Sequence, residues 1–530
     1  MANTKIPNEL LELGAKAFGT SSIMIGDNST GTINGANHNT GVGVDIFAAL
    51  TQGDENVAIG FEALTTLTTG SENIAVGYRT LKVNTGNSNV AVGKNALVAN
   101  TTASNNTAVG TSALVANTTA SNNTALGFEA LKANTTGEIN TAIGSQSMIT
   151  NTTGYGNTAV GRNSLYTNNG NNNTALGHEA LELNTTGASN VAVGRQALEA
   201  NTTASNNTAV GYQALLANTT GASNTAVGSL ALDANTTGQD NTAMGYNSLG
   251  ANTTGNYNTA VGYGSSEATT TGATNTSVGY NSLEANTTGS SNVAVGKDAL
   301  ATNSSASNNT VVGKSAMLVN TTGAKNVAMG TSALAGCTTG AENVAIGYSA
   351  GNDTVATTTG SGNVLIGPYT RASGATNDYS IAIGYNIDSA GSQVSIGRSG
   401  NKIYNEFDTD NAWSQSSDVR LKKNIEDSTL GLNFINDLRP VTYQWKPSNE
   451  LPKDLSHYNE ENEKTLDVTM TGLIAQEVKE AIDKSGVERF GGWDMDNDIQ
   501  QIKKEMFVFP LINAIKELSA KVEELENKLK

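Results

Sequence analysis

A glycine recurs at nearly constant spacing through more than half of this 530-residue chain. It ends a segment similar to Asn-Thr-Ala-Val-Gly at 19 positions, and 16 of the 18 intervals between them are 17 residues long. The other two intervals are 16 residues, and an asparagine stands four residues before each of these glycines. A period this regular is the sequence signature of a repeat architecture. The glycines are at 43, 60, 77, 93, 110, 127, 144, 161, 177, 194, 211, 228, 245, 262, 279, 296, 313, 330 and 347.

The typical unit, N-T-A-V-G-x-x-A-L-x-x-N-T-T-G-x-x, is too short for a pair of helices. Its Thr-Ala-Val segment predicts a short strand, and the leucine four residues after the glycine supplies a second apolar anchor. Asn-Thr-Thr-Gly is typical of a turn. We therefore expect two short strands and two turns per unit, with Val stacked on Val and Leu on Leu in a parallel β-solenoid. At a strand spacing of about 4.8 Å, 19 coils would make a rod of roughly 90 Å.

These Asn-x-Ala-Val/Ile-Gly segments resemble the head repeats of trimeric autotransporter adhesins. The resemblance covers residues 21–400 of this chain. It implies a left-handed parallel β-roll, in which three chains lie side by side.

Composition restricts what the solenoid can do. The formal net charge is −17, which argues against nucleic-acid binding through clustered cations and against attraction to anionic membranes. No apolar run is long enough to span a bilayer, and the N-terminus lacks the pattern of a secretory signal, so we expect no membrane insertion.

The single cysteine, Cys337, is expected to be a packing residue. His38 and His178 have no second ligand at metal spacing, so we predict no metal site and no cofactor.

The chain changes character near residue 400. Residues 417–530 hold 38 of its 77 charged side chains, and Trp445 and Trp493 lie there too. Three segments follow in order: S-D-V-R-L-K-K-N-I at 417–425, P-V-T-Y-Q-W-K at 440–446 and G-L-I-A-Q-E-V at 472–478. Together with the helical C-terminus, they resemble the endosialidase-type intramolecular chaperone family, which ends many phage tail fibres and tailspikes.

The resemblance implies a trimerising domain that afterwards cuts itself from the fibre with a serine–lysine pair. The matching residues are Ser417 as nucleophile and Lys422 as general base, and the scissile bond is Ser416–Ser417. Asp418 and Arg420 match the motif as well and take a supporting role.

The spacing of Ser417 and Lys422 does not by itself indicate chemistry. Residues five apart lie on different faces of a helix and on opposite faces of a strand, so the two must meet through an irregular loop. Without the resemblance, Ser417 and Asp418 would be interpreted as a helix cap and Lys422 as a solvated charge.

The C-terminal tail has its own pattern. Six apolar residues are spaced 4, 3, 4, 3 and 4 apart, which predicts a coiled-coil seam; a helix packed on its own domain is the alternative. The seam residues are Leu511, Ile515, Leu518, Val522, Leu525 and Leu529.

Residues 494–505 partly match a calcium loop, but Ile499 stands where the turn needs glycine, so an exposed hairpin is favoured.

The resulting expectation is a homotrimeric phage tail fibre, mostly β, that resides in the virion and binds a host-surface glycan or protein. Its parts would be an N-terminal segment (1–20) for attachment to the tail or baseplate, a shaft (21–400), a neck (401–416) and a small α+β chaperone domain (417–530). The alternatives are a bacterial surface adhesin and a glycan depolymerase. Scattered glutamates such as Glu62, Glu129 and Glu179 follow no pattern typical of a hydrolase site.

Overall fold

A computed structural model describes most of the chain, which divides into two compact units, Met1–Ser416 and Ser417–Lys530. The predicted attachment segment, 1–20, is described only at 15–17. No helix of the described ranges is both long and apolar enough to cross a bilayer. The residues described are 15–17, 21–26, 35–352, 355–407, 414–415, 419, 422–453, 455, 458, 460, 469–496 and 499–530.

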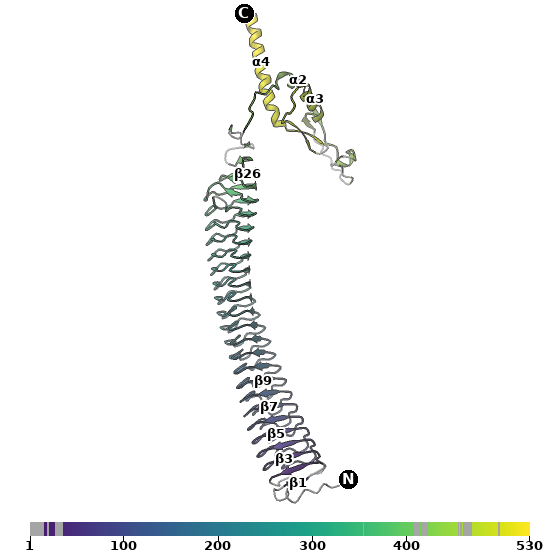
Figure 1. The fold of residues 1–530 in the computed structure, drawn as a ribbon, viewed down its shortest axis with the longest axis vertical. Helices are drawn as coiled ribbons and strands as arrows, with labels where there is room; N and C mark the ends of the chain where they lie inside the picture. Colours follow the sequence, from purple (N-terminus) through teal and green to yellow (C-terminus); the bar gives the residue numbers. More distant parts are fainter. Residues whose placement is uncertain are drawn as a thin grey trace. The chain divides into compact units, whose positions relative to one another are not determined.

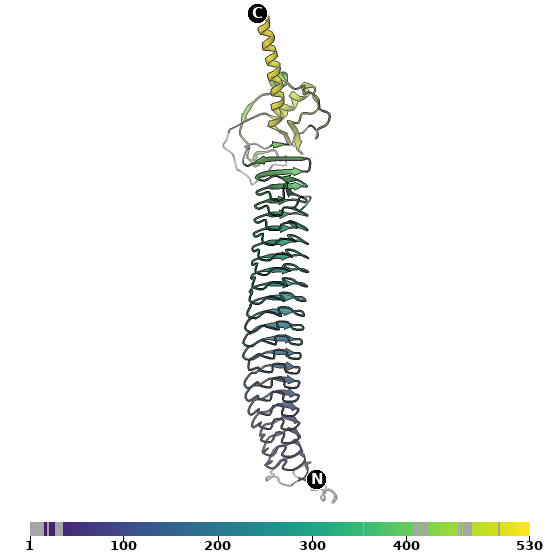
Figure 2. The same ribbon diagram turned by 90° about the vertical axis from the view of Figure 1, so that its left-hand side faces the viewer.

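The first unit is a parallel β-solenoid, as predicted, and its coils stack one upon another in both views of Figures 1 and 2. From β2 onward each repeat contributes one three-residue strand, paired in parallel with the same positions of the next repeat, as in Thr208↔Thr225 and Val210↔Val227; β1 pairs antiparallel with β2. The strands are β1 (Ala15–Ala17), β2 (Ile23–Ile25), β3 (Thr40–Val42), β4 (Val57–Ile59), β5 (Ile74–Val76), β6 (Val90–Val92), β7 (Thr107–Val109), β8 (Thr124–Leu126), β9 (Thr141–Ile143), β10 (Thr158–Val160), β11 (Thr174–Leu176), β12 (Val191–Val193), β13 (Thr208–Val210), β14 (Thr225–Val227), β15 (Thr242–Met244), β16 (Thr259–Val261), β17 (Thr276–Val278), β18 (Val293–Val295), β19 (Thr310–Val312), β20 (Val327–Met329), β21 (Val344–Ile346) and β22 (Val364–Ile366).

The solenoid ends in antiparallel pairing. The parallel order continues through β24 (Ile381–Tyr385) to β26 (Gln393–Arg398), with a small second pair of strands, β23 (Arg371–Ala372) and β25 (Asp388–Ser389). β27 (Asn401–Glu406) then folds back on β26, and β28 (Ser414–Gln415) pairs with β27. Residues 401–406 of the predicted neck therefore belong to the sheet.

The repeated glycine is required by the distance between coils. Gly211 has a φ of +141°, and a Cβ built on it would lie 2.4 Å from the carbonyl oxygen of Gly228 in the next coil. The same arrangement recurs between Gly228 and Gly245. Any side chain at this corner would push adjacent coils apart, which explains the invariance of the residue along the repeats.

A ladder of buried asparagines connects the coils. These are the asparagines four residues before each repeated glycine. The Oδ1 of Asn207 accepts the backbone N–H of Asn224 at 2.9 Å, and its Nδ2 donates to the carbonyl of Gly221 at 2.9 Å. Both residues are fully buried. Because the next coil repeats these bonds, every ladder amide satisfies a backbone group that the interior would otherwise leave unpaired.

The asparagines of the Asn-Thr-Thr triplets form a second ladder. Asn117 Nδ2 donates to Asn100 Oδ1 and, within its own turn, to the carbonyl of Ala120, both at 2.9 Å. These asparagines are also fully buried. The Asn-Thr-Thr segments thus form turns, as predicted, and their amides are inaccessible in the folded coil. Cys337 takes one of the ladder positions, where burial raises the pKa of its thiol to about 11.

The expected second strand is absent from the described residues of the coils from β3 to β21, whereas after β22 and β24 the short strands β23 and β25 stand at the position of the leucine. Leu64, Leu97 and Leu198 are fully buried apolar anchors, as predicted, but their φ angles are 47°, 51° and 53°. A left-handed conformation costs a non-glycine residue about 1 kcal/mol. The inter-coil bonds continue through it, since the Leu97 N–H donates to the Ala113 carbonyl at 3.0 Å. The leucine therefore reaches the interior from a turn, and the coil keeps a single strand.

The Val residues stack on one another as predicted, and they point outward from the coil. The buried residue of each strand is its middle one, which is Ala in sixteen of the twenty strands β3–β22. The first and third residues, such as Thr208 and Val210, point outward because side chains alternate along a strand. Larger residues are the exception at the middle position, with Val311 and Leu365 fully buried in β19 and β22.

One coil interrupts the apolar interior. Ser266 stands in the position of the leucine and Ser277 in that of the strand alanine, and both are buried. Ser265 Oγ donates to Ser277 Oγ at 2.7 Å and lies 3.0 Å from Ser282 Oγ. The hydroxyls satisfy one another, so this coil is joined by hydrogen bonds where its neighbours are joined by aliphatic contacts.

The second unit is small and mixed. Its buried core is Leu430, Phe434, Val478, Ala481, Ile482 and Phe507. The elements are α2 (Leu432–Asp437), β29 (Val441–Tyr443), a 3₁₀ turn at Ser448–Glu450, β30 (Met470–Gly472), α3 (Ala475–Ser485), β31 (Trp493–Asp496), β32 (Ile499–Ile502), a 3₁₀ turn at Lys504–Phe507 and α4 (Val508–Leu529).

Helix α4 extends beyond its own unit's core. Pro510 and Ala514 are its buried residues, and α2 packs against it. The six predicted seam residues are all at least 44% exposed, rising to 88% at Leu529. The seam is therefore not consumed by packing within the chain, which contradicts the alternative of a helix lying on its own domain.

The asparagine ladder makes a stability prediction. Asn207→Ala leaves the N–H of Asn224 without a partner and removes one of the two amide donors of the Gly221 carbonyl, the other being Asn218, which we expect to cost about 2 kcal/mol. Thr203→Ala, at an exposed turn position of the same coil, should cost less than about 0.5 kcal/mol. Denaturant unfolding measures both, and amide exchange should quicken at Asn224 only in the first variant. Equal stabilities would contradict a structural role for the ladder.

Candidate functional site

The predicted cleavage site is described only in part. Ser416, Ser417, Asp418 and Arg420 lie outside the described residues. Of the predicted pair, Lys422 alone is described, so its distance from Ser417 stays a prediction.

Lys422 lies in irregular backbone. Its N–H donates to the Val419 carbonyl at 3.1 Å, and residues 422–430 form neither helix nor strand. The side chains of Val419 and Lys422 are exposed. Irregular backbone here agrees with the requirement that residues five apart meet through a loop.

The second and third motifs come together. β29 pairs antiparallel with β30, with Val441 opposite Gly472 and Tyr443 opposite Met470. A Cβ on Gly472 would lie 3.0 Å from the Tyr443 ring, so glycine allows the tyrosine to cover the strand. The Tyr443 ring in turn meets Trp445 edge to face, with centroids 5.4 Å apart.

An ion pair joins the same two segments. The Arg439 guanidinium, just before β29, donates through both Nε and a terminal nitrogen to the Glu477 carboxylate on α3. This hydrogen-bonded pair holds the pKa of Glu477 below its ordinary value. The third motif also supplies Val478, which is buried against the core around Phe434. The second and third motifs therefore pack together in the structure.

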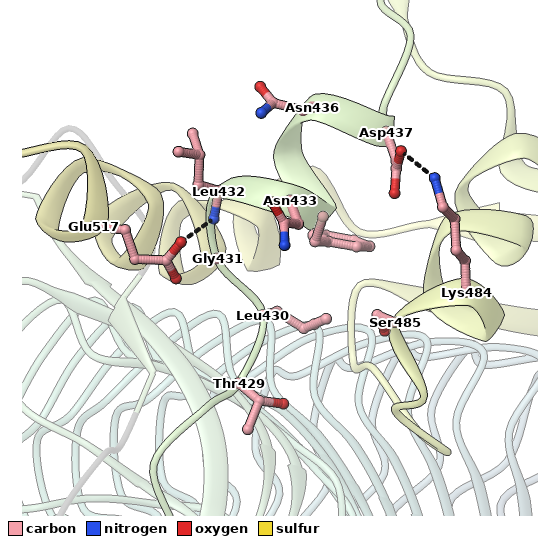
Figure 3. A pocket seen from close by; sticks show the side chains of 11 residues that line it. Thr429, Leu430, Gly431, Leu432, Asn433, Asn436, Asp437, Lys484, Ser485 and Glu517 are labelled. Carbon is pink, nitrogen blue, oxygen red and sulfur yellow. Dashed lines mark hydrogen bonds and ion pairs between the residues drawn. The ribbon is translucent and has the colours of Figure 1, made fainter. Parts of the chain in front are cut away.

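A pocket of about 550 Å³ lies where α2, α3 and α4 meet, and Figure 3 shows its lining. Glu517 accepts the N–H of Leu432 at 3.0 Å, and Lys484 Nζ lies 2.7 Å from Asp437 Oδ1 (Figure 3). Ser485 Oγ donates to the Ile482 carbonyl. Lys484 and Asp437 thus pair with each other, whereas Glu517 and Ser485 bond to the backbone; we assign the pocket a structural role.

The acidic segment of the tail forms a hairpin, as favoured from the sequence. β31 pairs antiparallel with β32, from Trp493↔Ile502 to Asp496↔Ile499. Lys503 donates to Asp494 at 3.3 Å and lowers the pKa of that carboxyl. A carboxylate that is already paired with a lysine is poorly suited to act as a calcium ligand.

Two of the shaft glutamates singled out from the sequence are paired with cations. Glu62 binds Arg79 at 2.9 Å and Lys82 at 2.7 Å, and Glu129 binds Lys132 at 2.8 Å. These contacts lower the pKa of both carboxyls, chiefly through the lysine hydrogen bonds. Neither glutamate is held in the protonated state that a general acid needs.

Glu179 belongs to a cluster that the sequence reading missed. Oxygens of Glu179, Glu182 and Glu199 lie within 4.8 Å of one another. Burial, and then the charge of Glu179, raises the pKa of Glu182 and of Glu199. His178 Nδ1 is 3.2 Å from Glu179, and Gln196 donates to it at 3.1 Å. The sequence could have indicated this cluster, because Glu182 and Glu199 occupy the same repeat position in consecutive coils.

Comparison with known proteins identifies the second unit. Residues 417–487 match the family model described as the chaperone of endosialidase. The match begins at the first motif, includes the other two and ends before β31, so α4 lies beyond it. A search of curated proteins finds no match to this chain.

The raised pKa of Glu199 in the carboxylate cluster predicts that replacing Glu199 by a neutral residue stabilises the fold, by an amount that depends on pH. A raised pKa means that the folded state favours protonated Glu199, so its stabilising contribution is lost as the pH rises through that pKa. Glu199→Gln should raise the melting temperature at pH 7 by an amount equivalent to a few tenths of a kcal/mol, and the difference should vanish below the ordinary glutamate pKa of 4.5. Glu138→Gln, at an exposed position of another coil, is the control. A gain that is the same at pH 7 and pH 3.5 would contradict charge repulsion as the cause.

Proposed function

We propose that this chain, whose second unit carries a chaperone-of-endosialidase domain behind a long parallel β-solenoid, is a trimeric phage tail fibre. In this proposal the C-terminal unit assembles three chains and then cleaves itself off before Ser417. The remaining shaft projects from the virion, with residues 1–20 attached to the tail or baseplate and the shaft contacting a host-surface glycan or protein. The observation that carries the proposal is the family match at 417–487 directly after the solenoid.

The solenoid explains why assembly needs help. Successive coils are nearly identical in sequence and pair through the same positions, so a shift by one coil leaves most contacts unchanged. Because the coils repeat, the contacts between neighbouring chains specify their register only weakly. Long β-structures also form slowly, because distant contacts must close before they stabilise anything. A trimerising unit at one end would fix the register from which the shaft grows.

The seam of α4 suits that role. It presents six apolar residues with coiled-coil spacing, all exposed in the single chain. Burying such side chains contributes about 1.5–3 kcal/mol each when complete, so association is the expected fate of the helix. The family implies that three copies associate, whereas the heptad pattern alone, with Ile and Val alternating with Leu, favours two.

The cleavage chemistry follows from the two predicted residues. Ser417 Oγ would attack the carbonyl carbon of Ser416 while Lys422 Nζ accepts the hydroxyl proton. The C–N bond then breaks, the Ser417 nitrogen takes a proton, and water hydrolyses the resulting ester to give a new carboxylate at Ser416. Lysine acts as a base only when neutral, and desolvation favours that form. Because Lys422 is exposed in the single chain, we propose that trimer formation covers it and so times the cut after assembly.

The cleavage prediction is tested by intact mass. Wild type should give fragments of residues 1–416 and 417–530, whereas Ser417→Ala and Lys422→Arg should stay full-length, since arginine does not deprotonate. Lys423→Arg, at the next position, should cleave normally. Cleavage of the Ser417→Ala variant, or an uncut wild type, would refute the assigned chemistry.

Association through α4 is tested separately. Leu518→Asp puts a charge in the seam and should convert the uncut Ser417→Ala chain from trimer to monomer or to unassembled aggregate. Ala520→Asp puts the same charge on the exposed face, away from the seam, and should leave the trimer intact. Multi-angle light scattering reports the mass, and a trimer unaffected by both substitutions would exclude the seam.

A further inference from the structure

A short segment of the C-terminal unit is fixed to α4 at both of its ends. We define this segment, residues 428–432, as the strap; it joins the exposed loop that contains Lys422 to helix α2. At the first end, Asn513 Nδ2 donates to the carbonyl of Ser428 at 3.0 Å and to that of Leu430 at 3.1 Å. The bonds go to the backbone of the strap, so they fix the path of the chain itself.

Glu517 holds the other end of the strap. Its carboxylate accepts the N–H of Leu432, the first residue of α2, at 3.0 Å (Figure 3). The first N–H groups of a helix have no partner within the helix, and the helix dipole favours a carboxylate beside them. Gly431 makes this contact possible, because a Cβ on it would lie 1.9 Å from Glu517 Oε1. The strap therefore has glycine at the point where the carboxylate crosses its backbone.

The loop before the strap contributes no side chain to the core. Residues 422–429 are all exposed, and their backbone forms neither helix nor strand. Leu430 is the first buried residue after Lys422, and it packs in the core around Phe434. Because six residues of chain reach about 20 Å at most, the bond at Ser428 limits where Lys422 can lie relative to α4. The strap thus joins the loop that contains Lys422 to the packed part of the unit.

The strap and the seam lie on opposite faces of α4. Asn513 and Glu517 each come two residues after a seam residue, Leu511 and Ile515, and two residues turn an α-helix by about 200°. Helices that associate through the seam therefore keep the strap contacts on the other side. One helix connects the proposed interface between chains with the loop that contains Lys422. The strap belongs to the region that matches the family, whereas α4 lies beyond it.

We propose that Asn513 and Glu517 are positioning residues for self-cleavage, which hold the strap on α4 and so fix where the loop presents the Lys422 amine. The inference rests on the cleavage proposed above and adds the residues that link it to assembly. Neither side chain exchanges a proton with the reacting groups; the proton still passes from Ser417 Oγ to Lys422 Nζ. A displacement of about 1 Å can slow an oriented reaction about a hundredfold, so a few hydrogen bonds to the strap suffice to control the rate.

Asn513→Asp tests the first contact. Aspartate has nearly the shape of asparagine, but its ionised carboxylate cannot donate to the two carbonyls. Asn527→Asp is the control, because Asn527 is exposed and lies two heptads further along the same face of α4. In trimers, we expect Asn513→Asp to cleave at least tenfold more slowly than wild type and Asn527→Asp to cleave at the wild-type rate. Pulse-labelled cell-free synthesis gives the rate: native electrophoresis isolates the trimer at each time, and a denaturing gel gives the cut fraction within it.

Glu517 is tested by removal and rescue. Glu517→Ala deletes the acceptor of the Leu432 N–H and should slow cleavage within the trimer at least fivefold. Glu517→Gln keeps an acceptor oxygen at the same reach, so it should restore most of the rate. Glu524→Ala, one heptad further along the same face, should cleave as wild type. In the uncut Ser417→Ala background, all of these substitutions should leave the mass of the trimer unchanged.

The outcomes separate this inference from the proposed function. Trimers of Asn513→Asp and Glu517→Ala that cleave at the wild-type rate would overturn the positioning role and leave the proposed cleavage intact. Loss of the trimer in both variants would assign the contacts to assembly and would also overturn it. A wild-type trimer that stays uncut would refute the proposed cleavage itself.

Discussion

The hydrogen bond between a buried asparagine and the backbone of the next coil is the contact on which the solenoid depends. Asn207 Oδ1 accepts the Asn224 N–H and its Nδ2 satisfies the Gly221 carbonyl, and this arrangement recurs from coil to coil. A coil has a narrow apolar interior, made in most repeats chiefly by the strand Ala and the Leu of the turn. Its polar backbone must therefore be satisfied internally, and the ladder does so at the same place in each coil.

The repeated hydrogen bonds and the small interior residues have two consequences for assembly. Because each coil uses the same bonds, the ladder fixes spacing but does not distinguish one coil from the next. Because the middle strand residue is small in most coils and the Leu comes from the turn, the apolar third residue of a strand, such as Val210, points outward. In our proposal other copies of the chain complete the protein, and a separate device sets their register. The second unit, with its exposed α4 seam and its chaperone-of-endosialidase match, fits that device.

Much of the fold could be predicted from the sequence, because period and turn chemistry are local. The repeated glycine and asparagine predicted the stacked coils, and the tail spacing predicted α4. The leucine segment was misassigned as a strand because its left-handed φ depends on bonds to the neighbouring coil, as between Leu97 and Ala113. The outward direction of Val210 was missed because the coil's thickness is not visible in one repeat.

The cleavage residues show a different limit of prediction. Ser417 and Lys422 were identified by resemblance, and no propensity or periodicity would have selected them. In our proposal they meet through an irregular loop and with the help of neighbouring chains. The acidic cluster of Glu179, Glu182 and Glu199 was in principle visible, because two of its members share a repeat position, but the raised pKa values come from burial that the sequence does not report.

Native mass spectrometry of the purified full-length product tests the central claim most directly, because it reads chain length and chain number together. The account predicts a complex of three chains that each end at Ser416, with the 417–530 fragment released or separately associated. A single uncut chain, or three chains that have never been cut, would contradict an assembly unit that works and then leaves.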